Sequence, residues 1–147
     1  MNHIPGYEDR AKCPSCDEPE DLNHILLKCR KPGQQEIWEL VWQLWSKKHN
    51  QWPTLTIGLL LGCYAAIFRN TRGRHDHALE RLFTTLVSES MHLIWRLRCE
   101  TVISRDNTPL SYQSIHNRWL QTINDCLALN RLQVNIHKLG VQALRTH

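Results

Sequence analysis

Apolar residues recur every three or four positions over several stretches of this chain, which is the spacing of amphipathic helices. The pattern is clearest in QQEIWELVWQLWSKKH, residues 34–49, and a longer one covers 77–104. A third helix is predicted over 112–130, and the apolar segment 54–68 predicts a short buried helix. We find no convincing alternation of apolar and polar residues of the kind that marks a strand. The chain is therefore predicted to be mainly α, with a bundle of about four helices.

Prolines, glycines and polar residues place the ends of these helices. Lys31-Pro32-Gly33 precedes the first helix, and Pro53 disfavours a helical residue before it. Asp76 is predicted to cap the long helix, because its side chain can accept a hydrogen bond from a free backbone N–H. The predicted buried faces of the two long helices consist of Leu79, Leu82, Phe83, Leu86, Val87, Met91, Ile94, Trp95, Ile115, Trp119, Leu120, Ile123 and Leu127. From Leu132 onward the periodicity is weak, so we expect that end to fray.

The segment before these helices, CPSCDEPEDLNHILLKC, has a different pattern. Its spacing is Cys-x2-Cys-x7-His-x4-Cys, formed by Cys13, Cys16, His24 and Cys29. Two thiolates from one tight turn, an imidazole and a third thiolate suit tetrahedral zinc. We therefore predict one structural Zn²⁺ in a small CCHC zinc-binding module over 1–33. A helical region over 34–147 follows, and the two parts could also form one integrated domain.

Two alternatives to zinc stay open, namely three reduced, buried cysteines beside a surface histidine, or a disulfide. The N-terminal residues lack the apolar core of a signal peptide, so we expect an intracellular protein, nuclear or cytoplasmic. The longest apolar run, 57–68, is too short to cross a bilayer as a helix, so no membrane partner is expected. The remaining Cys63, Cys99 and Cys126 are isolated in apolar helical segments, and we interpret them as core residues.

The stretches HIPGYEDRAKCPSC and NHILLKC together resemble the zinc-binding segment in reverse-transcriptase polyproteins of non-LTR retroelements. The residues that match this pattern are Cys13, Cys16, His24, Cys29 and Trp38. Asn23 stands where the family often has Glu, a departure that does not touch a ligand. Further along, IWELVWQLWSKKH, WPTLTIGLLLGC, SESMHLIWRLRCE and IHNRWLQTIN are similar to helical C-terminal regions of fungal retroelement-derived proteins.

This resemblance implies that the chain is the tail of such a polyprotein, as a fragment or a domesticated remnant. In the family, catalysis belongs to separate upstream domains, and some relatives carry ribonuclease H or reverse-transcriptase domains. The resemblance therefore implies a reverse-transcriptase or ribonuclease H domain as a partner.

The acidic residues of the chain do not form the sites that polymerase or ribonuclease H chemistry needs. No Asp-Asp pair is present to hold two Mg²⁺ ions, and the acids are single or lie around the cysteines. His75-Asp76 is interpreted as part of a helix cap, and His116-Asn117 as a solvated helix face. We predict that the chain is not an enzyme, and a zinc-dependent nuclease that uses His116 is the catalytic alternative.

The excess positive charge lies in the second part of the chain. Residues 51–147 contain eleven Lys/Arg against six Asp/Glu, whereas residues 1–50 contain seven against eight. The candidate nucleic-acid-binding residues are Lys28, Arg30, Lys31, Arg69, Arg72 and Arg74. Ordinary solvated side chains are the alternative, which we favour for Arg96, Arg98 and Arg118. The acids Asp17, Glu18, Glu20 and Asp21 would repel phosphate from one side of the zinc module.

These observations together predict a non-catalytic zinc-binding module that binds RNA or DNA, or braces a polymerase or ribonuclease H domain. The alternative is a zinc-stabilised protein-interaction module without nucleic-acid binding. A folded product of a decaying gene, with no selected role, is a third alternative.

Overall fold

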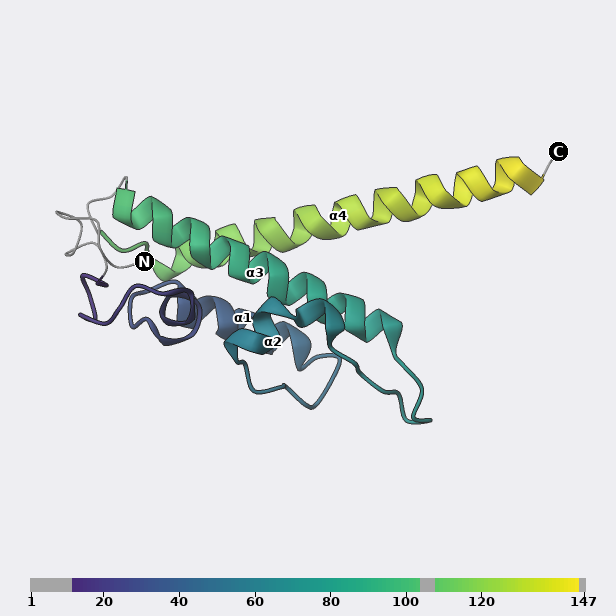
Figure 1. Cartoon of the computed structure of the whole chain (residues 1–147). Helices are drawn as coiled ribbons and strands as arrows, with labels where there is room; N and C mark the ends of the chain where they lie inside the picture. The colour runs from purple at the N-terminus through teal and green to yellow at the C-terminus, as the bar shows by residue number, and fades with distance from the viewer. Residues whose placement is uncertain (1–11, 104–107, 146–147) are drawn as a thin grey trace, which may run out of the picture.

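The computed structural model describes residues 12–103 and 108–145, with side chains as far as residue 133. The elements in chain order are the π-helix η2 (His24–Lys28), α1 (Gln34–Trp45), α2 (Ile57–Leu61), the 3₁₀-helix η3 (Cys63–Ala65), α3 (His77–Ile103) and α4 (Tyr112–Arg145). Figure 1 shows α1, α2 and the N-terminal segment along one side of α3, while α4 crosses α3 near its own start and then extends away on the other side. The described residues form no sheet and only two isolated bridges, so the predicted mainly α fold is confirmed.

The core forms where α1 packs on the middle of α3 and the start of α4. Ile37, Val41 and Trp45 lie on one face of α1 and are completely buried. The ring of Trp45 packs against Trp52, Phe68 and Phe83, with ring centroids between 5.1 and 5.8 Å apart. Its Nε1 donates a hydrogen bond of 2.8 Å to the Gln51 carbonyl, which satisfies the polar atom of a buried ring.

Local sequence signals account for the starts of the helices. Gly33 has a φ of +128°, a backbone conformation that favours glycine, and its N–H donates to Glu36 Oε2 at 2.7 Å. Asp76 Oδ1 accepts from the Leu79 N–H at 3.0 Å, so the predicted cap of α3 is confirmed. Thr56 caps α2 in the same way, accepting from the Leu59 N–H at 3.1 Å.

The segment 54–68 differs from the buried helix that we predicted. Its helices α2 and η3 are single turns, and Leu60 and Cys63 are buried in them. Leu61, Tyr64 and Ile67 are exposed, at 58%, 79% and 59% of their surface. One turn of helix can bury only one side against the core, so these three residues face solvent, while Ile57, Leu59 and Phe68 are partly buried against the core.

The prediction for the C-terminal segment was also wrong, because α4 continues to Arg145 rather than ending near residue 130. No proline interrupts this stretch. The burial predictions for Trp95, Leu120 and Leu127 were wrong as well, with 46%, 40% and 36% of their surfaces exposed. Trp119 is buried as predicted, and its Nε1 donates to Ser90 Oγ at 3.0 Å, which joins α4 to α3. Within the described ranges no helix is both long and apolar enough to cross a membrane.

Trp45→Ala tests the aromatic core. The substitution should lower the free energy of unfolding by about 3–5 kcal/mol, because it leaves a large cavity among three other rings. The matched control is Trp42→Ala, whose ring is 50% exposed on the same helix and should cost less than about 1 kcal/mol. Urea unfolding followed by circular dichroism measures both. Equal costs for the two variants would contradict this packing.

Candidate metal centre

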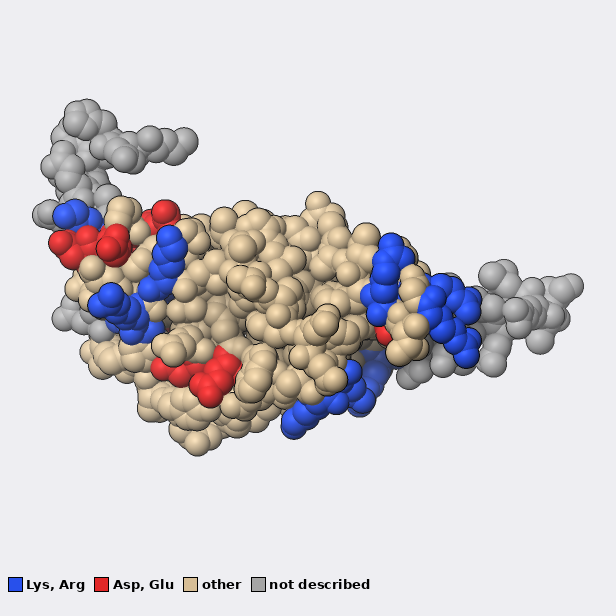
Figure 2. All heavy atoms as spheres, turned by 90° about the horizontal axis from the view of Figure 1, so that it is seen from below, with Lys and Arg blue, Asp and Glu red and all other residues tan. Residues whose placement is uncertain are grey.

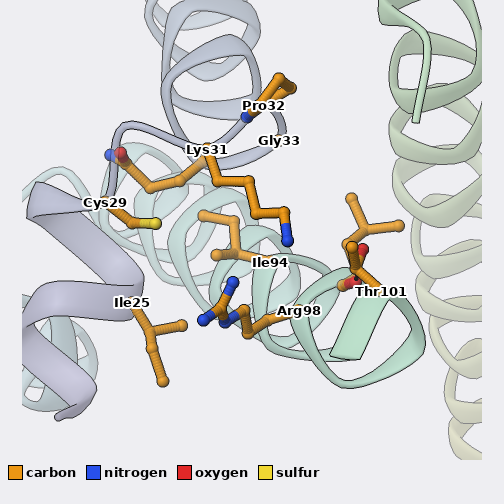
Figure 3. Close-up of a pocket in the computed structure, with 10 residues that line it drawn as sticks. Ile25, Cys29, Lys31, Pro32, Gly33, Ile94, Arg98 and Thr101 are labelled. Carbon is orange, nitrogen blue, oxygen red and sulfur yellow. Dashed lines mark hydrogen bonds between the residues drawn. The ribbon is translucent and has the colours of Figure 1, made fainter. Parts of the chain in front are cut away.

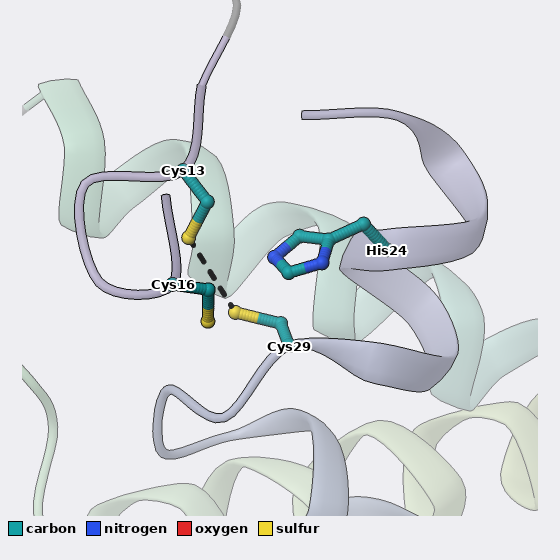
Figure 4. A group of neighbouring side chains, drawn as sticks. All are labelled: Cys13, Cys16, His24 and Cys29. Atoms are coloured by element: carbon teal, nitrogen blue, oxygen red, sulfur yellow. Dashed lines mark hydrogen bonds between the residues drawn. The ribbon is translucent and has the colours of Figure 1, made fainter. Parts of the chain in front are cut away.

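The first two cysteines lie in a tight reversal of the chain. The Asp17 N–H donates to the Cys13 carbonyl at 2.9 Å, and the Cys13 N–H donates to the Glu18 carbonyl at 2.8 Å. Asp17 has a φ of +56°, a left-handed conformation that aspartate tolerates better than most residues. Residues 12 and 19 then pair in an isolated bridge. This reversal brings the Cys13 and Cys16 sulfurs into one group, as Figure 4 shows.

The other two candidate ligands lie at the ends of η2. Asp21 Oδ1 accepts from the His24 N–H at 2.6 Å, which satisfies a backbone donor at the start of this helical segment. The Cys29 N–H donates to the His24 carbonyl at 2.8 Å, five residues back. In an α-helix, residues five apart point about 140° away from each other around the axis. The wider π turn brings Cys29 back towards the side of His24.

The four side chains converge on one point. Their ligand atoms all lie within 4.8 Å of one another, and the Cys13 and Cys29 sulfurs are 3.9 Å apart. His24 is 5% exposed, and its buried Nε2 has no hydrogen-bond partner within the described part of the chain. A buried nitrogen without a partner is costly unless something else binds it, and a metal ion would do so. The four residues could therefore bind one metal ion.

Both alternatives to a metal site differ from the structure. All six cysteines are free thiols, so no disulfide joins them. His24 is buried, whereas the second alternative required a surface histidine. Outside the cluster, Cys63 is buried in the core, and Cys99 and Cys126 are partly buried on the long helices.

The electrostatics of the cluster favour a bound cation. Burial alone would raise the pKa of the Cys13 thiol, but the Ser15 amide, the adjacent His24 ring, the Cys16 amide and the Arg98 charge lower this pKa to about 7. Burial raises the pKa of Cys29 to about 11, and the neighbouring Cys13 sulfur adds to the increase. Two thiolates cannot easily share this space, because each one destabilises the other. A divalent cation would remove that repulsion and allow all three sulfurs to ionise.

Arg98 of α3 connects this cluster to the helices. Its side chain is only 8% exposed and binds Glu20 through Nε and Nη2, both at 2.5 Å. The same Nη2 lies 3.5 Å from the Cys13 sulfur. Arg98 was predicted to be a solvated arginine, which is wrong. Its position in the sequence, four residues after Ile94, places it on the buried face of α3, and that spacing was the available signal.

Lys31 is oriented towards Arg98 rather than towards open solvent. Figure 3 shows the two side chains extending into one small cavity of about 30 Å³, which Cys29, Ile94 and Thr101 also line. Burial lowers the pKa of Lys31, and the Arg98 charge lowers it further. Lys31 therefore differs from Lys28 and Arg30, which are exposed.

The candidate nucleic-acid-binding residues lie in two separate places. Lys28 and Arg30 flank Cys29, whereas Arg69, Arg72 and Arg74 are exposed in the loop that leads into α3. Figure 2 shows Lys and Arg in separate groups towards the two ends of one face, with acidic side chains among the group nearer the N-terminus. These residues therefore do not form one continuous patch.

His75-Asp76 lies at the start of a helix and His116-Asn117 lies within one, as the sequence predicted. His75-Asp76 precedes α3, and Asp76 caps it. His116 is partly buried in α4, where its ring stacks on Tyr112 with centroids 6.1 Å apart.

No protein-family model, curated protein or solved structure matches this chain. The resemblance to retroelement zinc-binding segments thus rests on the sequence spacing alone.

Arg98→Met should lower the free energy of unfolding by about 3–5 kcal/mol, because it leaves the Glu20 carboxylate in a poorly solvated place without its partner. Arg118→Met is the matched control. Arg118 pairs with Glu100 on partly exposed surface, with 37% and 30% of the side chains accessible, so removing this pair should cost at most about 1 kcal/mol.

Urea unfolding of both variants with excess Zn²⁺ measures the difference. Adding Glu20→Gln to Arg98→Met should recover part of the stability, since the unpaired charge is then removed. A double variant that is less stable than Arg98→Met alone would contradict this account.

Proposed function

We propose that the chain is a non-catalytic module with one structural zinc held by Cys13, Cys16, His24 and Cys29. The convergence of these four ligand atoms carries the proposal. In a tetrahedral site with Zn–S bonds of about 2.3 Å, two sulfurs lie about 3.8 Å apart. The 3.9 Å between the Cys13 and Cys29 sulfurs agrees with that distance. Four protein ligands leave no coordination position for a catalytic water.

The role that we propose for this module is contact with a single-stranded nucleic acid. The Arg30 N–H donates to the Cys16 sulfur at 3.4 Å, so a metal bound by Cys16 also fixes the backbone of Arg30. Lys28 and Arg30 lie on either side of the ligand Cys29, and both are exposed. Zinc would thereby hold two cationic side chains in place for phosphate contacts.

The acidic residues around the cysteines oppose this role less than the sequence implied. Glu20 is neutralised by Arg98, and Asp21 accepts a hydrogen bond from the His24 backbone. Asp17 lies 3.5 Å from the Lys12 ammonium group, at the exposed side of the turn. Glu18 is the remaining acid without a role in the packing of the module.

The resemblance to retroelement zinc-binding segments gives this proposal its biological setting. In that setting the module belongs beside a reverse-transcriptase or ribonuclease H domain, and those domains supply the catalysis. The chain itself would bind the template or target strand.

Protein purified without added metal should contain one zinc per chain, measured by mass spectrometry of the metal. Cys16→Ser and His24→Ala should both lose this zinc and lower the thermal stability, because metal binding contributes folding free energy to so short a segment. The matched control is Cys126→Ser, which lies outside the cluster and should retain the zinc. Full zinc content in Cys16→Ser and His24→Ala would refute the site.

Nucleic-acid binding should show a steep dependence on salt. Fluorescence anisotropy with a labelled single-stranded RNA gives the slope of log K against log salt, to which each phosphate neutralised by the protein contributes about −0.7. Lys28→Ala with Arg30→Ala should make this slope shallower by about 1.4, because two cations are removed. Lys47→Ala with Lys48→Ala is the matched control, because these exposed lysines follow the end of α1.

The same titration with Arg72→Ala and Arg74→Ala tests whether the loop before α3 contributes. If the slope is unchanged both in the Lys28 and Arg30 variant and in the Arg72 and Arg74 variant, phosphate contact by these four residues is rejected. No binding to RNA or DNA at low salt would reject the nucleic-acid role altogether.

A second candidate function rests on exposed apolar residues in α2, in η3 and directly after η3. Leu61, Tyr64 and Ile67 present apolar surface within seven residues, which is typical of a protein-docking site. This surface would pack against a neighbouring polymerase or ribonuclease H domain and stabilise its position. Salt-independent association with such a domain, together with no nucleic-acid binding, would favour this function over the first.

A further inference from the structure

His75, His77 and Glu80 form a second cluster of possible metal ligands, at the start of α3. His75 Nδ1 lies 3.2 Å from Glu80 Oε1, and His77 Nδ1 lies 2.8 Å from Glu80 Oε2. The two imidazole rings have centroids 5.6 Å apart. One nitrogen from each histidine thus faces the same carboxylate, and all three ligand atoms lie within 4.8 Å of one another.

We propose that His75, His77 and Glu80 bind a second divalent transition-metal ion, with zinc as the natural candidate. Metal bonds to imidazole nitrogen and carboxylate oxygen are about 2.0–2.2 Å long. Two ligand atoms at that distance from one ion lie about 2.8–3.6 Å apart for bond angles between octahedral and tetrahedral. The distances of 2.8 and 3.2 Å lie at or close to this range, so only small side-chain movements are needed.

The backbone around the cluster holds the ligands in place before any metal binds. Glu80 Oε1 accepts from the Phe68 N–H at 3.2 Å, and the Asp76 N–H donates to the Phe68 carbonyl at 2.8 Å. Residues 69 and 75 pair in an isolated bridge. The carboxylate therefore keeps its orientation through a backbone partner, as metal-binding carboxylates commonly do.

The surroundings determine which metal this cluster would prefer. The arginines at 69, 72 and 74 and the N-terminal end of α3 both contribute positive potential. Cations held mainly by charge, such as Mg²⁺ and Ca²⁺, are disfavoured there. Imidazole nitrogens form stronger bonds with Zn²⁺, Ni²⁺ and Cu²⁺, and two of the three ligands are imidazoles. Three protein ligands leave at least one position for water or another oxygen ligand, unlike the closed four-ligand centre.

This cluster is independent of the cysteine site. Glu80 and Arg98 both lie on α3, and their separation of eighteen positions corresponds to about 27 Å of helix. Neither site shares a residue or a hydrogen bond with the other among the described contacts. Removal of one metal should therefore leave the other site intact.

Isothermal titration calorimetry of protein that already holds one zinc tests the proposal, with Zn²⁺ as the titrant. We expect a second equivalent to bind with a dissociation constant in the micromolar range. His77→Ala should weaken this binding at least tenfold, and Glu80→Gln should do so while keeping the shape of the side chain. His92→Ala is the matched control, because His92 is an exposed histidine in the middle of the same helix.

A separate readout locates the ion. NMR signals of the His75 and His77 rings should shift with the second equivalent, whereas those of His92 should not. The proposal is overturned if the wild-type chain takes up no second zinc, or if His77→Ala and Glu80→Gln bind it as the wild type does. The three residues would then form an ion-pair cluster that supports the start of α3.

Discussion

The contact of Arg98 with Glu20 and Cys13 is the constraint on which the arrangement of the N-terminal segment depends. Burying a guanidinium and a carboxylate has a large desolvation cost, so such a pair seldom adds much stability by itself. The role of this pair is to position the N-terminal turn relative to α3. It attaches the turn that contains Cys13 to a helix 85 residues away in the sequence, at 3.5 Å from the sulfur. The turn could otherwise adopt many orientations on the helices.

The charge of Arg98 also fits a loaded metal centre. Three thiolates and one divalent ion together carry a charge of about −1, and Glu20 adds another negative charge. Arg98 and Lys31, the two cations that extend into the same cavity, balance these two charges. In the metal-free state the raised pKa keeps Cys29 a neutral thiol, so these two cations face less negative charge. Metal binding and the packing of α3 would therefore support each other.

The segment that holds the four candidate ligands packs its buried apolar residues into the core of the helices. Ile25 and Leu26 of η2 are 5% and 2% exposed and belong to the same cluster of buried side chains as α1 and α3. Trp38 of α1 donates from Nε1 to the Leu26 carbonyl at 2.7 Å, which attaches the middle of η2 to α1. Zinc-binding segments of this length obtain their folding free energy from the ion and from their neighbours.

The sequence predicted the cluster of candidate ligands because its signal is local. Cys13, Cys16, His24 and Cys29 lie within seventeen residues, and the helices α1 and α3 follow from periodicity within each segment. The pair of Arg98 and Glu20 could not be predicted in this way. The two residues are 78 positions apart, and no local pattern in either segment indicates which residue the other will contact. Burial of single apolar residues failed for a similar reason. Trp95 fits the pattern of α3, but the neighbouring elements cover another face of that helix.

The length of α3 also decides how the charges of this chain can act. Salt screens interactions between exposed charges beyond about 8 Å at physiological ionic strength, and the two ends of α3 are separated by more than three times that distance. The basic residues beside Cys29 and those in the loop at 69–74 would therefore act on an anionic partner as two separate groups. The formal net charge of +4 is for this reason a poor guide to binding. What matters is whether a bound metal would hold the backbone of Lys28 and Arg30 in place. The Arg30 N–H donates to the Cys16 sulfur, so a metal bound by Cys16 would restrain this backbone directly.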